Sequence, residues 1–254
     1  MFLVNLLPDI LACIRFALLP TLLAVIKKPT LLLHPHALSR IFMAHAWNVL
    51  GDGIDSNSVE LKTDLITRNA EGVVLELGAG HGHTLKYLDK SRVTKYIALE
   101  PNDLMHPFIR DLGQLNGFRE SDGTLLILSC TADELLSAHS SLQVDTLVSI
   151  LTLCTIPNAQ TTVTNVVTQL LKPHTGQFLY YEHVLSPRSD VAWWQKFWSP
   201  IWSLFLDGCR LDKPTHLWVE RMGLWDEEKS RRWGLKDEPE DHPFWHQIGR
   251  YIRK

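Results

Sequence analysis

The chain has 254 residues, of which 45% are hydrophobic and 21% charged, a balance typical of a folded protein with one sizeable core and not of a disordered or fibrous one. Its formal net charge of −3 leaves no excess of lysine and arginine to neutralise phosphates, so we expect no nucleic-acid partner and favour a small-molecule substrate. The four cysteines form no CxxC pair, which predicts reduced thiols and neither a disulfide framework nor a zinc site.

The first segment, residues 2–26, is mostly apolar and is followed by Lys27 and Lys28. Asp9 and Arg15 interrupt the apolar run, which disfavours a helix that spans a membrane. The polar residues recur on one side of a helix, and the opposite side carries aliphatic residues, namely Leu6, Leu7, Ile10, Ile14 and Leu18. This pattern predicts peripheral or monotopic membrane contact, the alternative being a helix that packs on the core or caps a pocket.

From residue 59 onward, short apolar runs alternate with helical stretches, as in doubly wound α/β folds. The predicted strands are Val73–Leu77, Lys95–Glu100, Thr124–Ser129, Val144–Ile150 and Gln177–His183. The predicted helices include Thr84–Asp89, Asp133–Ala138 and Ala159–Leu171. Right-handed crossovers then give a parallel sheet with ligand sites at the carboxyl ends of its strands. We therefore divide the chain into an apolar helical extension, 1–58, and an α/β domain, 59–254.

A glycine turn follows the first predicted strand within Val73–Gly82. Gly78, Gly80 and Gly82 let the backbone turn sharply and approach a ligand closely. Their spacing is GxGxG, whereas the dinucleotide fingerprint is GxGxxG. Glu76 places a carboxylate beside the turn, where it can pair with a cationic group such as an α-ammonium. A purely structural turn and a nicotinamide site are the alternatives.

The next two strands end in residues suited to a nucleoside. Glu100 ends the second strand and precedes Pro101 and Asn102. A carboxylate at that tip can accept both hydroxyls of a ribose, which together with the glycine turn favours a ribose-containing ligand. The third strand leads to Ala132 and Asp133, where a backbone amide and an acid can meet an adenine amino group. The alternative is that Asp133 binds no ligand and is simply an acidic residue near a helix N-terminus, where acids are favoured.

Aromatic residues gather after the fifth strand, where eight of the nine tryptophans lie between Trp193 and Trp245. We predict an aromatic-rich lid over about residues 188–225. Its aromatic side chains suit a cover over a lipophilic acceptor or a belt at a membrane interface, and the alternative is that they pack in the core. Four aromatic residues recur there at helical spacing, namely Trp194, Trp198, Trp202 and Phe205. Pro200 is expected to divide this helix, and Gly208 to end the segment.

These motifs, in this order, resemble those of class I methyltransferases that use S-adenosyl-L-methionine (SAM). The segments Asp145–Asn158, Tyr181–His183 and Trp198–Arg210 are similar to the methyltransferase-like seven group, which contains membrane-bound alkyl thiol methyltransferases. The resemblance implies a Rossmann-like three-layer α/β sandwich with a mostly parallel seven-stranded sheet and one antiparallel strand near the carboxyl terminus. The chain departs from the pattern at Asp226–Arg232, which is too charged for a buried strand.

The resemblance also implies SAM as the cofactor. Its binding residues would be Glu76, Gly78, Gly80 and Gly82 at the methionine moiety, Glu100 at the ribose with Asn102 beside it, Ala132 and Asp133 at the adenine, and Leu151 beneath the sulfonium. It further implies an intracellular, membrane-associated protein, at the endoplasmic reticulum or a lipid droplet, with its catalytic domain facing the cytosol.

Methyl transfer from a sulfonium is an in-line displacement that needs an aligned, desolvated nucleophile and no covalent residue. A thiol or phenol acceptor must lose its proton, so we predict His183 as the base and Glu182 as its orienting partner. Adjacent strand residues point to opposite faces, so only one of the two can face the cofactor. His81 and His83 are alternatives, and their HxH pair has no third ligand at a suitable spacing, so no metal is predicted.

The sequence therefore predicts a SAM-dependent methyltransferase that acts on the sulfur or oxygen of a small lipophilic acceptor, with a thiol favoured. One alternative is an O-methyltransferase that tailors a secondary metabolite. Another is a methyltransferase-like protein that binds a ligand without transferring a methyl group.

Overall fold

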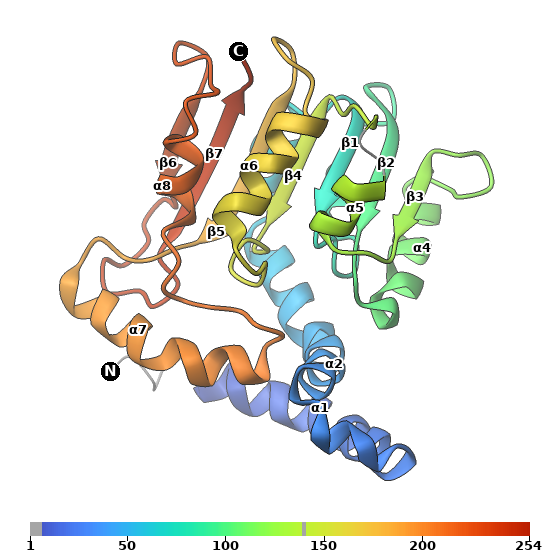
Figure 1. Cartoon of the computed structure of the whole chain (residues 1–254), viewed down its shortest axis with the longest axis vertical. Helices are drawn as coiled ribbons and strands as arrows, with labels where there is room; N and C mark the ends of the chain where they lie inside the picture. Colours follow the sequence, from blue (N-terminus) through green and yellow to red (C-terminus); the bar gives the residue numbers. More distant parts are fainter. Residues whose placement is uncertain (1–6, 139–140) are drawn as a thin grey trace.

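The computed structural model describes residues 7–138 and 141–254, with side chains from residue 10 onward. Seven strands form one sheet in the order β3-β2-β1-β4-β5-β7-β6 (Figure 1). The strands are β1 (Gly72–Leu77), β2 (Val93–Leu99), β3 (Leu125–Leu128), β4 (Thr146–Ile150), β5 (Gln177–His183), β6 (Arg231–Gly234) and β7 (His246–Ile252). Strands β1 to β5 pair in parallel, and β7 is antiparallel to both of its neighbours. The mostly parallel seven-stranded sheet is thus confirmed.

Helices cover both faces of the sheet. They are α1 (Leu7–Lys27), α2 (Pro35–Asn57), α3 (Val59–Lys62), α4 (His106–Leu115), α5 (Ala132–Ala138), α6 (Ala159–Leu170), α7 (Ser189–Phe205) and α8 (Thr215–Glu220). Short 3₁₀ turns are η1 (Pro29–Leu33), η3 (His83–Tyr87) and η4 (Asp103–Met105), and η2 (Thr63–Thr67) is a π turn. Helices α5, α6 and α8 lie on one face and α4 on the other, which confirms the three-layer sandwich (Figure 1).

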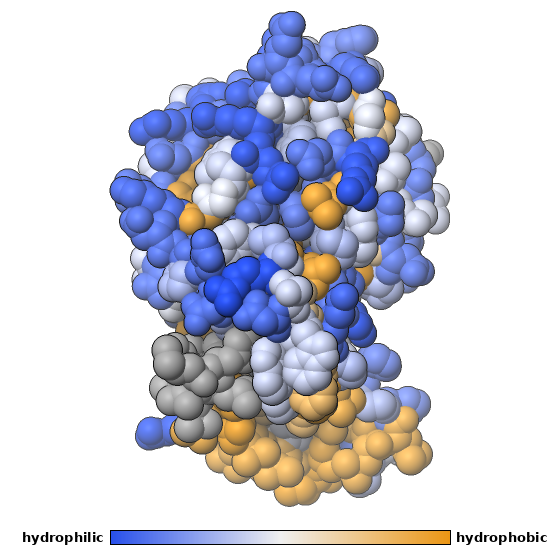
Figure 2. All heavy atoms as spheres, turned by 90° about the vertical axis from the view of Figure 1, so that its left-hand side faces the viewer, coloured by the Kyte–Doolittle hydropathy of each residue, from blue (hydrophilic) through white to orange (hydrophobic). Residues whose placement is uncertain are grey.

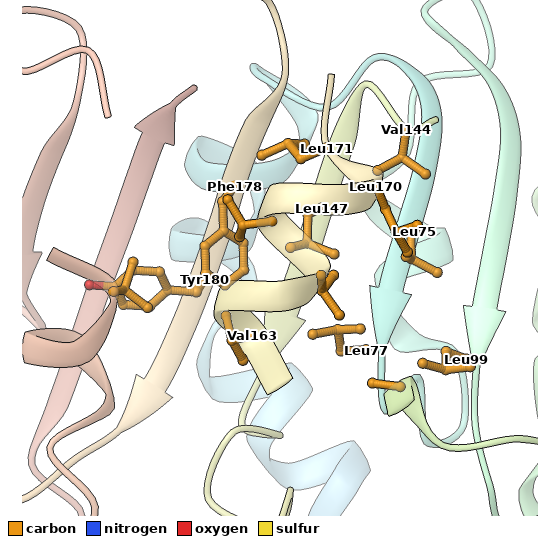
Figure 3. Close-up of a cluster of buried hydrophobic side chains, with 14 of the residues drawn as sticks. Leu75, Leu77, Leu99, Val144, Leu147, Val163, Leu170, Leu171, Phe178 and Tyr180 are labelled. Atoms are coloured by element: carbon orange, nitrogen blue, oxygen red, sulfur yellow. The ribbon is translucent and has the colours of Figure 1, made fainter. Parts of the chain in front are cut away.

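The core lies on both sides of the sheet, because successive strand residues point to opposite faces. On the α6 side, Leu75 packs with Leu147 and Leu170 (Figure 3). On the other side, Val74 packs in a cluster that includes Ile109 of α4. The inner strands are buried on both faces, so each is a continuous apolar run. Such runs are easy to recognise in the sequence, which is why the inner strands were predicted well.

Two local features differ from the sequence prediction, and the structure adds detail to two others. The segment predicted as a helix at Thr84–Asp89 is the 3₁₀ turn η3. Pro200 lies inside a continuous α7, where Ser199 donates to Asp212 (2.8 Å) and so anchors the helix next to the proline. The charged segment Asp226–Arg232 leads into strand β6. Its charges are tolerated there because β6 is an edge strand with mostly exposed residues. The predicted lid divides into α7, below the strand ends, and α8, which packs against α6.

Helices α1 and α7 both pack against α2, at the end of the molecule toward which the parallel strands point (Figure 1). The side of α1 that is buried consists of small residues, Cys13, Ala17 and Thr21. The large apolar side chains of both helices are exposed, namely Leu11, Ile14, Phe16, Leu18, Leu19, Leu22, Leu23 and Ile26 on α1 and Trp193, Trp194, Phe197, Ile201, Leu204 and Phe205 on α7. Figure 2 shows a hydrophobic band at this end.

The apolar surface of α1 is wider than the predicted stripe. Ile14 and Leu18 are exposed as part of it, whereas Leu6 and Leu7 lie outside the described side chains. Ile10–Lys27 is long and apolar enough to cross a membrane, judged by length and composition alone, and 17% of it is buried within the protein.

Asp55 attaches the end of α2 to the α/β domain. Its Oδ1 accepts hydrogen bonds from Lys62 Nζ (2.8 Å) and Tyr87 OH (3.0 Å), and its Oδ2 accepts from Lys86 Nζ (2.9 Å). Burial would raise the pKa of Asp55, but the hydrogen bonds from the two lysines outweigh burial and lower that pKa. The carboxylate is therefore an ionised link between α2 and η3.

Replacing Asp55 by alanine is expected to lower the free energy of unfolding by about 3–5 kcal/mol, because Lys62 would remain buried without its anion. As a control, Asp64→Ala removes an exposed pair with Arg68 and should cost about 0.5 kcal/mol or less. Urea unfolding of both variants measures the difference. Equal losses would contradict the assigned role of Asp55.

Candidate functional site

The glycine turn lies at the carboxyl end of β1, against α2. Gly78 and Gly80 have φ values of +59° and +55°, which strain residues that carry a Cβ. A Cβ on Gly78 would lie 2.5 Å from Cγ2 of Thr152, and a Cβ on Gly80 would lie 2.9 Å from Nε1 of Trp47. Backbone conformation and close packing therefore both require glycine here.

A pocket borders this turn and is lined by residues of α2, β1 and the loop after β4, among them Trp47, Glu76, Gly78 and Leu151. Nε1 of Trp47 is buried and has no hydrogen-bond partner in the described part of the chain. Leu151 has a left-handed φ of +53°, and its N–H donates to the carbonyl of Tyr181 (2.8 Å). Three of the predicted cofactor residues thus line one pocket together with an unpaired donor.

Glu76 is buried at the floor of this site. One carboxylate oxygen accepts from Thr84 Oγ1 (2.6 Å) and the other from the hydroxyl of Tyr96. Burial outweighs these hydrogen bonds and raises the pKa of Glu76 to about 7. A cation placed beside this carboxyl group would favour its ionised form.

Glu100 joins the tip of β2 to the glycine turn. Its Oε2 accepts from the amide of Gly80 (2.8 Å) and its Oε1 from the amide of Asn102 (2.8 Å), which leaves each oxygen able to accept one more hydrogen bond. Burial raises the pKa of Glu100. Asn102 in turn donates from Nδ2 to the carbonyl of Arg40 in α2 (3.1 Å), so its side chain attaches α2 to the site.

Ala132 and Asp133 begin α5 at the tip of β3. Ala132 is buried, whereas Asp133 is exposed and accepts from Thr162 Oγ1 (3.1 Å). Thr131 and Glu134 form a reciprocal cap, in which Glu134 accepts from the amide of Thr131 (2.7 Å) and Thr131 Oγ1 accepts from the amide of Glu134 (3.3 Å). The T-x-x-E spacing of Thr131 and Glu134 is the sequence signal for this cap. Neither Ala132 nor Asp133 lines the described pocket.

Glu182 and His183 point to different neighbours, as expected for adjacent strand residues. Glu182 accepts from Ser149 Oγ (2.7 Å) and from the amides of Thr152 (3.0 Å) and Leu153 (3.2 Å). Burial raises its pKa to about 7. These contacts show Glu182 holding the loop after β4.

His183 lies in a buried cluster with two thiols. Its Nε2 is 3.4 Å from Cys209 Sγ, which is also 3.4 Å from Cys154 Sγ. Burial would lower the pKa of His183, but the neighbouring Cys209 sulfur and the Glu182 carboxylate outweigh it and raise that pKa. Sequence reasoning missed the cluster, because Cys209 is 26 residues from His183 and 55 from Cys154.

The two histidines of the glycine turn have other contacts. His81 stacks on Phe108 of α4 with ring centroids 4.0 Å apart, and His83 Nε2 lies 2.8 Å from Asp52 Oδ1 in α2. Burial lowers the pKa of both, that of His81 to about 4. These contacts attach the turn to α4 and α2, and no third metal ligand joins the pair among the described residues.

The fold is that of the class I methyltransferases. An O-methyltransferase family protein from Burkholderia thailandensis superposes with a TM-score of 0.61 at 12% identity, covering 86% of this chain and 60% of that one. A putative O-methyltransferase from Nostoc punctiforme superposes with a TM-score of 0.60 at 11% identity, covering 95% and 72%.

In sequence, the chain is 28% identical over 159 residues to thiol S-methyltransferase TMT1B of Rattus norvegicus, and 29% identical over 150 residues to thiol S-methyltransferase TMT1A of Homo sapiens. These alignments cover 62% and 58% of the chain, and the same shares of the two relatives, which is less than two thirds of their length. No family model matches the chain.

Truncating Glu182 to alanine should release the loop after β4, because the amides of Thr152 and Leu153 would lose their buried acceptor. We expect these two amides to exchange hydrogen for deuterium at least about tenfold faster, the change that corresponds to about 1.4 kcal/mol of local stability. Glu120→Ala, which removes an exposed carboxylate, is the control. Unchanged exchange in Glu182→Ala would contradict the loop-holding role.

Proposed function

We propose that the protein is a SAM-dependent methyltransferase that transfers a methyl group to the sulfur or oxygen of a small lipophilic acceptor, with a thiol favoured. The hydrogen bond between Gly80 and Glu100 carries this proposal, because it gathers the glycine turn, Glu76 and a strand-tip carboxylate at one place. Similarity to two thiol S-methyltransferases supports both the reaction and the thiol.

The residues of the site fit SAM. Trp47 Nε1, a buried donor without a partner, would donate to the carboxylate of the methionine moiety, and Glu76 would pair with its ammonium. Glu100 has a free acceptor position on each oxygen for the ribose hydroxyls. The glycine turn admits the ligand where a Cβ would obstruct it, and the cofactor supplies an electrophilic methyl group.

The remaining predicted residues have the following roles in this proposal. Leu151 forms the wall beneath the sulfonium, and Ala132 and Asp133 lie toward the adenine. His183 stays the candidate for handling the acceptor proton, and Glu182 acts indirectly by holding the loop beside it. Burial of His183 and Leu153 keeps water from the acceptor side.

The test of the proposal is incubation of the full chain with SAM and a panel of alkyl thiols and phenols. We expect methylated thiol and S-adenosylhomocysteine in equal amounts. Methylation of phenols alone would favour the O-methyltransferase alternative, and SAM binding without transfer would favour a binding protein. No SAM binding would refute the proposal.

We further propose that α1 and α7 contact a membrane. Both helices expose large apolar side chains at the end of the molecule that holds the site. Lys27 ends α1 and Lys28 follows it, where lipid headgroups would lie. This placement would bring a lipophilic acceptor to the catalytic side. By the resemblance, the membrane is that of the endoplasmic reticulum or a lipid droplet, with the α/β domain facing the cytosol.

Glu100→Ala should weaken SAM binding by about 1.5–3 kcal/mol, the range for hydrogen bonds to a charged group. Isothermal titration calorimetry measures the change, and circular dichroism shows whether the variant stays folded. Glu120→Ala, which alters a carboxylate outside the site, should bind SAM normally. Equal affinities for Glu100→Ala and the unchanged protein would remove Glu100 from the site.

The double variant Leu19→Glu with Leu23→Glu should lose binding to vesicles of phosphatidylcholine with phosphatidylserine, because each buried aliphatic side chain contributes about 1.5–3 kcal/mol. Both residues are exposed on α1, so folding should be unaffected. Leu115→Glu, at an exposed leucine of α4, is the matched control. Sedimentation with vesicles measures binding, and a wild-type protein that stays in the supernatant would contradict membrane contact.

A further inference from the structure

We propose that Cys154, His183 and Cys209 form a zinc site with one open coordination position. Cys209 Sγ lies 3.4 Å from both Cys154 Sγ and His183 Nε2, and all three ligand atoms lie within 4.8 Å of one another. Tetrahedral zinc, with bonds of about 2.3 Å to sulfur and about 2.0 Å to nitrogen, separates such ligands by roughly 3.5–3.8 Å. The cluster is therefore close to the geometry that the ion requires.

The chemistry of the three side chains fits the same ion. Two thiols and an imidazole form a Cys₂His set, which occurs at zinc sites that retain an exchangeable ligand. All three are buried, with at most 8% of each residue exposed. Two thiolates balance the charge of Zn²⁺ and a neutral imidazole adds none, so the occupied site would place no net charge in the interior.

The surrounding backbone holds the three ligands in place. His183 ends β5, and Cys154 lies in the loop that Glu182 fixes through Thr152 and Leu153. The segment after α7 is joined to this loop by a hydrogen bond from the amide of Arg210 to the carbonyl of Cys154 (3.2 Å). Ligands preset in this way lower the cost of binding a metal.

The open position would face apolar side chains. Cys154 and Cys209 pack in a cluster with Phe42 and Met43 of α2, Trp202 of α7, and Leu206 directly after α7. A zinc ion with three protein ligands keeps its fourth position for water or a substrate. A lipophilic thiol in that position would place its chain against α2 and α7.

The catalytic use of this site rests on the proposed methyl transfer. A thiol that binds at the fourth position would displace the water there and release its proton to bulk solvent, because the metal stabilises the thiolate. The thiolate sulfur then bonds to the methyl carbon of SAM while the carbon–sulfonium bond breaks, and that electron pair stays on the sulfur of S-adenosylhomocysteine. Zinc thus acidifies the acceptor, and His183 serves as a ligand in place of its predicted role as base.

The metal content of the full chain tests the site without any methyl transfer. After loading with zinc and dialysis, we expect about one zinc ion per chain, and a loss of at least about tenfold in Cys209→Ser and His183→Ala. Cys130→Ser, at a thiol outside the cluster, should keep its zinc. So should His242→Ala, from a second group formed with Glu238 and His246.

Cobalt supplies the second measurement. The cobalt-loaded protein should show a sulfur-to-metal charge-transfer band that changes with hexanethiol and not with hexanol. Absence of zinc from the loaded protein, loss of zinc in His242→Ala, or a Cys154–Cys209 disulfide in its place would refute the site. A cobalt spectrum unaffected by hexanethiol would refute the open position. Because no arm uses SAM, a failure here is distinct from failure of the methyl-transfer proposal.

Discussion

The candidate site depends on the contact between the amide of Gly80 and the carboxylate of Glu100. This hydrogen bond fixes the glycine turn against the neighbouring strand tip, and Glu100 uses its other oxygen to hold the amide of Asn102. Thr152 and Trp47 fill the space where a Cβ at Gly78 or Gly80 would lie. Two strands, α2 and the loop after β4 therefore meet at one point, and none of them can shift without disturbing the others.

Helix α2 links this point to the apolar end of the molecule. Trp47 of α2 contacts the glycine turn, and Asp55 of α2 binds the α/β domain. Helix α2 also packs against α1, whose small side chains around Ala17 are buried. The exposed leucines and aromatic residues of α1 and α7 lie at the same end as the strand tips (Figures 1 and 2). The proposed membrane face and the proposed acceptor side are thus built on one helix, which suits a substrate that partitions into lipid.

The sequence predicted the inner sheet well, since β5 was located to the residue and buried parallel strands are continuous apolar runs. It failed at Pro200, where tertiary contacts of Ser199 hold α7 continuous. It also predicted that Glu76 and Glu100 lie at the same edge of the sheet, because the tips of parallel strands converge there. The cluster of Cys154 and Cys209 with the predicted His183 was not foreseeable, because it depends on how the segment after α7 folds back onto the loop after β4.

The central claim is that SAM binds across the tips of β1 and β2 with its reactive sulfur toward the loop after β4. A crystal structure of the full chain with S-adenosylhomocysteine tests it most directly. The account predicts ribose hydroxyls on the carboxylate of Glu100, the amino group near Glu76, and the sulfur between Leu151 and the side chains of Cys154 and His183. A ligand bound elsewhere, or with its ribose away from Glu100, would contradict the account.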